Sequence, residues 1–226
     1  MRAGRMNFEA ARIKMVDNQI RTTDVTSHAV LSAFLSVPRE EFVPAAMKPL
    51  AYIDTDIELT ASGASERRYL MEPSPLAKLL QLASVTKTDK VLEIGCGTGY
   101  ASAILSTLAA TVVALESDAA LASEATETLA RLGYSNVTVV TGDLEKGHTA
   151  AAPYDVIFVH GAVETVPDSL FAQLSDGGRL VAVVGSGNAS RAKVCLHENG
   201  ITSERLAFNT AVKPLPGFRL VREFVF

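Results

Sequence analysis

The chain of 226 residues contains no tryptophan, only two cysteines and no long apolar run. Cys96 and Cys195 are too few for a disulfide framework, so we expect reduced thiols in a cytoplasmic protein. The longest apolar runs fall far short of the roughly 18 residues that suggest a transmembrane helix. The first residues also lack the apolar stretch of a secretory signal. We therefore expect a globular protein with no membrane partner.

An excess of positive charge is also missing. The chain has 21 basic and 25 acidic residues, a formal net charge of −4 at pH 7, and no conspicuous Lys/Arg cluster. A polyanion has little to bind on such a chain, so we expect no nucleic-acid partner. Hydrophobic residues make up 48% and charged residues 20%, which is ordinary globular usage and excludes disordered and coiled-coil classes.

The character of the sequence changes near Lys90. From residue 7 to about residue 80, apolar residues recur at helical spacings and prolines interrupt them, which predicts helices. The polar segment 54–69 predicts an exposed loop, and Pro73 opens a further helix. We therefore predict a helical and lid region over residues 1–82, packed on a main domain over residues 83–226.

After Lys90, short apolar runs alternate with helical stretches. The predicted strands are 90–94, 111–115, 137–140, 155–159, 179–184, 219–226 and a further one around 201–208. The predicted helices between them are 101–108, 119–132 and 169–174. Unbroken apolar strands separated by helices are typical of a parallel sheet that is covered on both faces. The sequence therefore predicts an α/β fold with a doubly wound, mostly parallel, seven-stranded sheet.

The most informative segment follows the strand predicted at 90–94. Gly95, Gly97 and Gly99 stand at alternate positions just before a predicted helix, where backbone N–H groups can approach a ligand closely. Glu116 closes the next strand about 20 residues after Gly95, the spacing expected of an acidic residue that accepts hydrogen bonds from ribose hydroxyls. A ligand that contains a nucleoside is predicted here.

Neighbouring residues narrow the choice of ligand. A dinucleotide fingerprint needs glycine where this chain has Tyr100, and the Gly-Lys-Ser/Thr of a phosphate-binding P-loop is absent. Glu93, two residues before Gly95, would repel phosphate and suits a ligand with ammonium and sulfonium groups. A cationic nucleoside is favoured. A nicotinamide-dependent oxidoreductase stays open as an alternative, disfavoured by Tyr100 and by the lack of a Tyr-x-x-x-Lys proton relay.

Segment 91–100 resembles motif I of the class I S-adenosylmethionine-dependent methyltransferases. Segments 15–20, 37–44, 152–157 and 173–180 are similar to the protein-L-isoaspartate O-methyltransferase family. The resemblance implies a Rossmann-like fold, S-adenosylmethionine as cofactor with S-adenosylhomocysteine as product, no metal, and a carboxylate acceptor on a peptide, a damaged protein or a small molecule. Glu116 then resembles the ribose acid, and Asp143 the residue that meets the adenine amino group. The implied cofactor-binding residues are Glu93, Gly95, Cys96, Gly97, Gly99, Tyr100, Glu116, Ser117, Asp143 and Leu144.

One motif departs from this family. Members that repair isoaspartate are expected to carry Gly-x-Gly-Gln-Thr-Ile-Ser-x-Pro, whose serine contacts the reacting carboxylate, and alignment of the prolines places Met71 at that serine. Glu72 beside it adds a like charge, unless Arg67 or Arg68 compensates; such a doublet is usually a solvated loop face. We therefore expect weak or absent methylation of isoaspartyl peptides. The alternatives are a different acceptor, or a binding module that keeps the cofactor and has lost its chemistry.

His160 ends the strand predicted at 155–159, at the rim where ligands of open α/β sheets bind, and it either contacts the acceptor or caps the following loop. A carboxylate acceptor is already nucleophilic, so the rate depends on placement and on exclusion of water. A hydroxyl or amine acceptor would need a base, for which His160 and Glu72 are the candidates. The predicted catalytic residues are thus Met71, Glu72 and His160, and we expect no nucleophilic role for Cys96.

Overall fold

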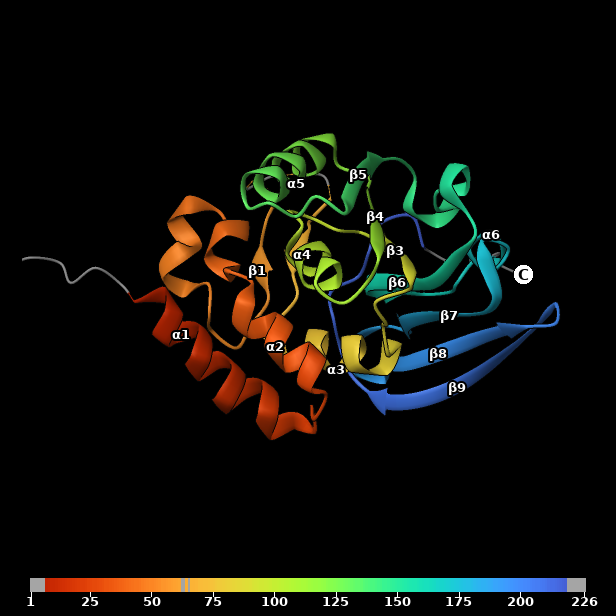
Figure 1. The fold of residues 1–226 in the computed structure, drawn as a ribbon, viewed down its shortest axis with the longest axis horizontal. Helices are drawn as coiled ribbons and strands as arrows, with labels where there is room; N and C mark the ends of the chain where they lie inside the picture. The colour runs from red at the N-terminus through yellow and green to blue at the C-terminus, as the bar shows by residue number, and fades with distance from the viewer. Residues whose placement is uncertain (1–6, 62–63, 65, 219–226) are drawn as a thin grey trace, which may run out of the picture.

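The computed structural model describes residues 7–61, 64 and 66–218, and its centre is a seven-stranded sheet (Figure 1). The strands are β3 (Lys90–Ile94), β4 (Thr111–Glu116), β5 (Val137–Thr141), β6 (Tyr154–Val163), β7 (Leu174–Val184), β8 (Arg191–Glu198) and β9 (Ile201–Asn209). They lie in the order β5-β4-β3-β6-β7-β8-β9. The first five strands of this order, β5, β4, β3, β6 and β7, run parallel, whereas β8 and β9 are antiparallel to their neighbours. The predicted α/β class and mostly parallel sheet are confirmed.

Strand β8 was missed by the sequence prediction. Its residues mix exposed and buried positions and lie between two antiparallel neighbours, so they form no continuous apolar run. The seventh strand was expected at 219–226 instead, and that segment lies outside the described residues. With β8 the observed sheet reaches seven strands.

The two faces of the sheet bury two different sets of side chains. Successive residues of a strand point to opposite faces, so Val91 and Leu92 of β3 belong to separate apolar clusters. The cluster of Val91 includes residues from α3 (Pro73–Ala83), α4 (Tyr100–Ser106) and α5 (Ala119–Arg131). The cluster of Leu92 includes residues of the short helix α6 (Asp168–Phe171), which is shorter than the predicted 169–174 because residue 174 already begins β7.

The N-terminal region is helical, as predicted. It contains α1 (Phe8–Met15), a π turn (Val16–Ile20), a 3-10 turn (Arg21–Thr23), α2 (His28–Ser36) and two further 3-10 turns (Arg39–Phe42 and Ala45–Leu50). Side-chain oxygens of Asn7 and Ser27 accept first-turn N–H groups and fix the starts of α1 and α2. Apolar side chains of this region join the cluster of Val91. The division at residue 82 stays a prediction, because one core spans both sides of it.

The segment predicted as an exposed loop, 54–69, is exposed or half-buried at most of its described positions but carries two short paired strands with buried residues. Strand β1 (Ile57–Glu58) pairs with β2 (Tyr69–Leu70) in antiparallel register, and we call residues 57–70 the β1–β2 hairpin. Ile57, Leu59 and Arg68 are buried, because alternate residues of the hairpin turn inward. The prediction of exposure was therefore wrong for the inward-facing residues.

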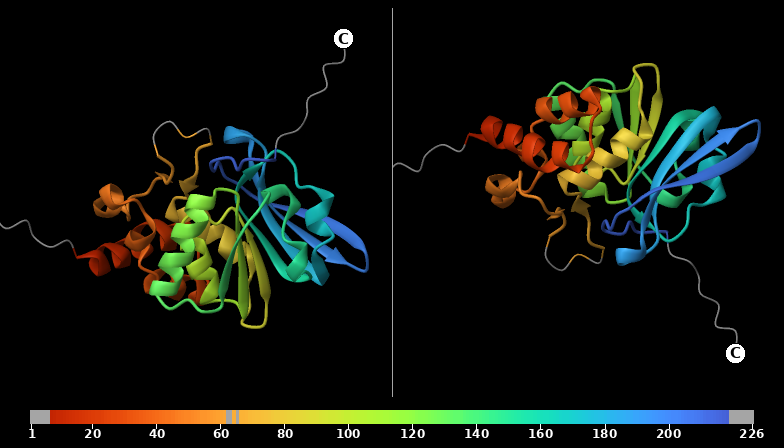
Figure 2. Two further views of the ribbon diagram at one scale, coloured as in Figure 1. Left: turned by 90° about the horizontal axis from the view of Figure 1, so that it is seen from above. Right: turned by 90° about the horizontal axis from the view of Figure 1, so that it is seen from below.

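The N-terminal helices lie toward one end of the molecule, and the β8–β9 pair extends toward the other (Figure 2). The β1–β2 hairpin lies beside the segment 212–218, and both line one cavity. Over the part of the chain that the structure describes, no helix combines the length and the apolar character needed to cross a membrane.

Candidate functional site

The glycine loop connects β3 to α4 at the carboxyl end of the sheet. Gly95, Gly97 and Gly99 have φ angles of +85°, +58° and +93°, a region that favours glycine. The backbone N–H groups of Gly95 and Cys96 donate to the carbonyl oxygen of Leu115 at 2.8 and 3.1 Å, which fixes the loop against the end of β4. The loop therefore keeps the close backbone geometry that the sequence predicts for a ligand site.

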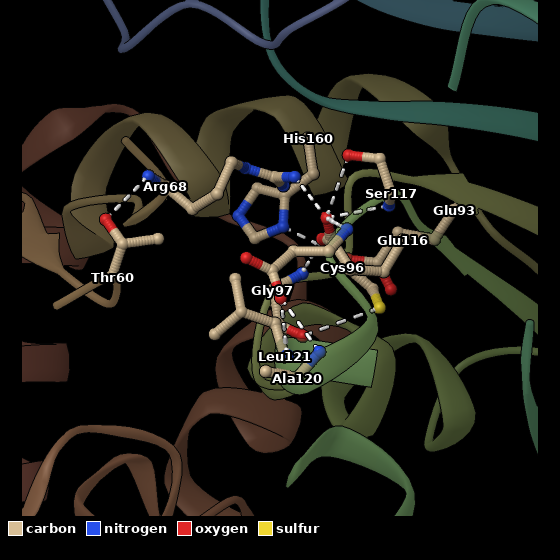
Figure 3. A network of polar contacts seen from close by, with 11 residues as sticks. Thr60, Arg68, Glu93, Cys96, Gly97, Glu116, Ser117, Ala120, Leu121 and His160 are labelled. Atoms are coloured by element: carbon tan, nitrogen blue, oxygen red, sulfur yellow. Dashed lines mark hydrogen bonds and ion pairs between the residues drawn. The ribbon is translucent and has the colours of Figure 1, made fainter. Parts of the chain in front are cut away.

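Glu116, at the end of β4, is fully buried and is bonded to this loop (Figure 3). One carboxylate oxygen, Oε2, accepts the Gly97 N–H at 2.7 Å. The other, Oε1, accepts the backbone N–H groups of Ser117 at 2.8 Å and Asp118 at 3.1 Å. The structure thus brings together the loop, Glu116 and Ser117, three of the features that the sequence assigned to the cofactor.

Arg68 of the β1–β2 hairpin supplies a further partner of Glu116. Its guanidinium donates to Oε1 of Glu116, with side chains that are 4% and 0% exposed. The interpretation of the Arg67–Arg68 doublet as a solvated face holds for Arg67, which is 66% exposed, and is wrong for Arg68. Inward and outward positions alternate along the hairpin, so the two arginines face opposite ways. The buried ion pair of Arg68 with Glu116 is the feature of this site that the sequence did not predict.

Glu93 faces His160 instead of the loop's ligand side. Its Oε1 lies 3.1 Å from the His160 Nδ1, and its Oε2 accepts a hydrogen bond from the Ser102 hydroxyl. Glu93 is fully buried, and His160 is 5% exposed. A carboxylate without solvent takes its partners from the protein, and the partners of Glu93 are His160 and Ser102. Its contact with a cationic ligand stays a prediction.

The second ring nitrogen of His160, Nε2, is buried and has no hydrogen-bond partner among the described residues. With Nδ1 on the Glu93 carboxylate, the neutral ring carries its proton on Nδ1 and presents a lone pair at Nε2. The alternative role of His160, capping of the following loop, is not the interaction that its ring makes. Nε2 is consequently a polar group without a protein partner at the rim of the sheet.

Asp143 and Leu144 follow β5, the neighbour of β4. Gly142 donates its N–H to the backbone carbonyl of Glu116 at 3.0 Å, which ties this turn to the end of β4. The side chain of Asp143 is exposed and pairs with Lys146, whereas Leu144 is buried. An exposed carboxylate beside an apolar side chain, both next to Glu116, fits the predicted recognition of an adenine ring.

Cys96 and Tyr100 have packing roles. Burial, and then the charges of Glu93 and Glu116, raise the pKa of the Cys96 thiol well above its usual range, so it is a neutral filler of the loop. The Tyr100 ring packs against Phe34 and Phe42 at centroid distances of 6.1 and 5.7 Å. Burial raises the pKa of Tyr100 to about 12. The Tyr100 side chain therefore attaches the N-terminal region to α4, and a cofactor contact of residue Tyr100 stays a prediction.

Met71 is buried in the apolar core, and its carbonyl oxygen accepts from the Arg39 guanidinium at 2.8 Å. These contacts give Met71 a packing role in place of the predicted catalytic one. Glu72 precedes α3, and its backbone N–H donates to Asp56. Partial burial and then the like charges of Asp56 and Asp54 raise the pKa of Glu72. Its carboxylate thus belongs to an acidic group that would disfavour a second carboxylate close by.

A large cavity, about 1040 Å³, opens at the carboxyl ends of β6 and β7. Its walls are the β1–β2 hairpin, with Arg67 and Tyr69, and the segment 212–218, with Lys213 and Leu215. Leu215 also contacts the positions where a Cβ on Gly95 or Gly161 would lie, at 2.7 and 2.6 Å. Leu215 therefore separates this cavity from the glycine loop. The loop carries the residues predicted to bind the cofactor, so we interpret the cavity as a neighbouring subsite.

A glycine loop after β3, an acidic residue at the end of β4 and this strand order define a class I S-adenosylmethionine-dependent methyltransferase. The family model for protein-L-isoaspartate(D-aspartate) O-methyltransferase (PCMT) matches residues 10–215. The chain belongs to this family and is an S-adenosylmethionine-dependent methyltransferase. A protein-L-isoaspartate O-methyltransferase of Koribacter versatilis is 42% identical over 179 residues, which are 79% of this chain and 78% of the relative.

Solved structures agree with the family in fold. A protein-L-isoaspartate O-methyltransferase superimposes with a TM-score of 0.79 at 30% identity, over 91% of this chain and 66% of the solved one. A putative protein-L-isoaspartate O-methyltransferase of Plasmodium falciparum, solved in complex with S-adenosyl-L-homocysteine, gives a TM-score of 0.76 at 17% identity. The superposition covers 93% of this chain and 99% of the solved one, and at that identity it supports the fold alone.

Proposed function

We propose that the chain methylates the isoaspartyl carboxylate of a damaged peptide or protein. The observation that carries this proposal is the buried Glu116 carboxylate, bonded to the glycine loop, beside a large cavity whose charged wall residues are Arg67, Lys213, Glu66 and Glu164. The first feature suits a nucleoside, and the second suits a carboxylate on a peptide. Family membership favours this acceptor over the expected weak activity, and over the alternatives of a binding module and an oxidoreductase.

The residues of the rim fit the cofactor. Backbone atoms of Gly95 and Gly97 would hold its chain, Glu116 its ribose hydroxyls, and Asp143 with Leu144 its adenine. When bound, S-adenosylmethionine supplies a methyl group on a positively charged sulfur. Glu116 keeps its own position through backbone donors, so it is preorganised as an acceptor.

The cavity residues would place the acceptor. Lys213 lies over the Tyr69 ring at 5.3 Å from its centroid, so a cation and an aromatic edge face the same cavity. A carboxylate held there is nucleophilic without a base, and in-line placement can supply about 7–11 kcal/mol of the barrier reduction. Glu93 would hold the His160 ring in place through Nδ1. Exclusion of water by Leu59 and Leu215 would complete the site.

The experiment follows transfer of labelled methyl groups from S-adenosylmethionine to an isoaspartyl peptide, with the matching aspartyl peptide as control. We expect transfer to the isoaspartyl peptide only. Glu116→Gln keeps the shape of the side chain and removes its charge, which costs about 1.5–3 kcal/mol, or roughly ten- to a hundredfold in S-adenosylhomocysteine affinity. Glu41→Gln, on the exposed Lys48 and Arg131 pair, is the matched control. Equal transfer to both peptides, or unchanged affinity in Glu116→Gln, would contradict the proposal.

A further inference from the structure

Arg68 and the ribose of the cofactor have the same partner. The guanidinium of Arg68 donates to Oε1 of Glu116, the carboxylate proposed above to accept ribose hydroxyls. A terminal nitrogen of Arg68 also lies 3.0 Å from the position of a Cβ on Gly95, so the arginine covers the loop (Figure 3). In this structure the cation of the β1–β2 hairpin occupies the side of Glu116 that the nucleoside would approach.

The hairpin fixes the backbone of Arg68 while leaving its side chain one polar partner. The Arg68 N–H donates to the Thr60 hydroxyl at 3.2 Å, and the Arg68 carbonyl accepts the Leu59 N–H at 2.8 Å. Beyond the backbone, Glu116 is the partner that the described residues give to Arg68. The guanidinium can therefore move by side-chain rotation without unfolding the hairpin.

The donors to Glu116 crowd one of its two oxygens. Oε1 accepts from Arg68, from the backbone N–H groups of Ser117 and Asp118 and, at 3.3 Å, from the Ser117 hydroxyl. Oε2 accepts the Gly97 N–H. A carboxylate oxygen offers about two acceptor positions, so Oε1 is the oversubscribed one. The backbone donors are fixed by the glycine loop and by the start of α5, and the Ser117 hydroxyl is local to Glu116, so at Oε1 Arg68 is the donor from another element that a ribose hydroxyl would displace.

The following inference rests on the proposed function. We propose that Arg68 binds a carboxylate of a ligand. Glu116 holds the Arg68 guanidinium until the ribose hydroxyls of the cofactor displace it. A buried guanidinium without an anion is strongly disfavoured, so a released Arg68 requires a second carboxylate. Two carboxylates reach this rim during the reaction: that of the cofactor's amino-acid end and that of the acceptor. Arg68 would thus take over the anchoring that the serine replaced by Met71 gives in the family motif.

The test uses 5′-methylthioadenosine, which has the ribose and lacks the amino-acid carboxylate, and S-adenosylhomocysteine, which has both. Calorimetric titration compares the native chain with Arg68→Ala, and with Arg131→Ala as the control at an exposed ion pair. We expect Arg68→Ala to bind 5′-methylthioadenosine about tenfold more tightly, because its ribose no longer competes, and Arg131→Ala to bind as the native chain does.

Binding of the two ligands identifies the second carboxylate. If Arg68 takes the cofactor's carboxylate, Arg68→Ala binds S-adenosylhomocysteine more weakly while binding 5′-methylthioadenosine more tightly. If it takes the acceptor's, Arg68→Ala binds both ligands more tightly, and the KM for the isoaspartyl peptide rises. An affinity of Arg68→Ala for 5′-methylthioadenosine that equals or falls below the native value would overturn the inference.

A second measurement covers a failure of Arg68→Ala to fold. In the native chain labelled with ¹⁵N, the Arg68 Nε–H signal, identified by its loss in Arg68→Lys, should shift when 5′-methylthioadenosine is added. A signal that stays in place at saturation would equally overturn the inference. If neither the native chain nor Arg68→Ala binds either ligand, both the proposed function and the inference about Arg68 are wrong. If both proteins bind the ligands with equal affinities, only the inference about Arg68 is wrong.

Discussion

Replacement of Met71 by serine distinguishes the role that the sequence alignment predicts for this residue from the role that the structure indicates. By alignment of the prolines, Met71→Ser restores the family hydroxyl and should improve use of an isoaspartyl carboxylate. In the structure the Met71 side chain is 3% exposed and belongs to the main apolar core. The substitution should therefore behave as a core truncation, and we expect lower stability without a gain in activity.

The magnitude follows from what the substitution removes. Truncation of a buried methionine costs roughly 2–5 kcal/mol, depending on how far the surroundings relax. A serine hydroxyl left without a partner adds about 1–3 kcal/mol. The Arg39 bond to the Met71 carbonyl is retained, since it involves the backbone. We expect the free energy of unfolding to fall by about 3–8 kcal/mol, the sum of the two contributions.

The assay is urea denaturation followed by circular dichroism, together with methyl transfer to an isoaspartyl peptide at a temperature where both proteins are folded. Met71→Leu is the matched control, because a swap of similar volume costs less than about 1.5 kcal/mol. A Met71→Ser protein as stable as the native chain, with faster transfer, would refute the reasoning. Such a result would mean that residue 71 faces the acceptor.

Two further predictions concern buried charges. Arg39→Lys should lower the free energy of unfolding by roughly 1–3 kcal/mol in thermal denaturation, because one ammonium nitrogen replaces the two separate guanidinium nitrogens that donate to the Ala51 and Met71 carbonyls. Arg131→Lys at the exposed pair should change little. Burial by itself raises the pKa of Asp89, but hydrogen bonds from Thr86 and Arg179 outweigh it and hold that pKa below its usual value. The ionised carboxylate therefore stabilises the fold above the unfolded pKa of roughly 3.9, and this stabilisation is lost as the pH falls through the lower folded pKa. The stability difference between the native chain and Asp89→Asn should be full near pH 7 and shrink in acid, and a difference constant down to pH 3 would contradict it.

The parts of the fold with local signals were predictable. The strand predicted at 90–94 has the observed bounds, because its apolar run and the glycines after it are properties of neighbouring residues. The closeness of Gly97 and Glu116 was also predictable, since parallel strands bring their carboxyl ends to one edge. The helical region before Pro73 was visible for the same local reason.

The roles of single side chains in the β1–β2 hairpin were not predictable. Arg67 and Arg68 are chemically identical, and the pairing of Glu58 with Tyr69 decides which of them turns inward. That pairing joins residues on either side of a polar segment without a periodic pattern. Met71 was misjudged differently: alignment of a proline gives its position along the chain but not the direction of its side chain.

Glu93 and Glu116 flank the same loop, and both were predicted to face the cofactor. The two carboxylates differ in the hydrogen-bond partners that surround them. Glu93 is bonded to Ser102, on a helix packed into the core, and to His160, on a strand, so neither partner can leave without disturbing the fold. Glu116 has backbone donors and the neighbouring Ser117 hydroxyl that keep it in place, and one donor from a distant element, Arg68, that we propose to be exchangeable. Burial of a carboxylate demands partners in both cases. A carboxylate serves a ligand only where one partner is exchangeable, and at this rim Glu116 meets that condition.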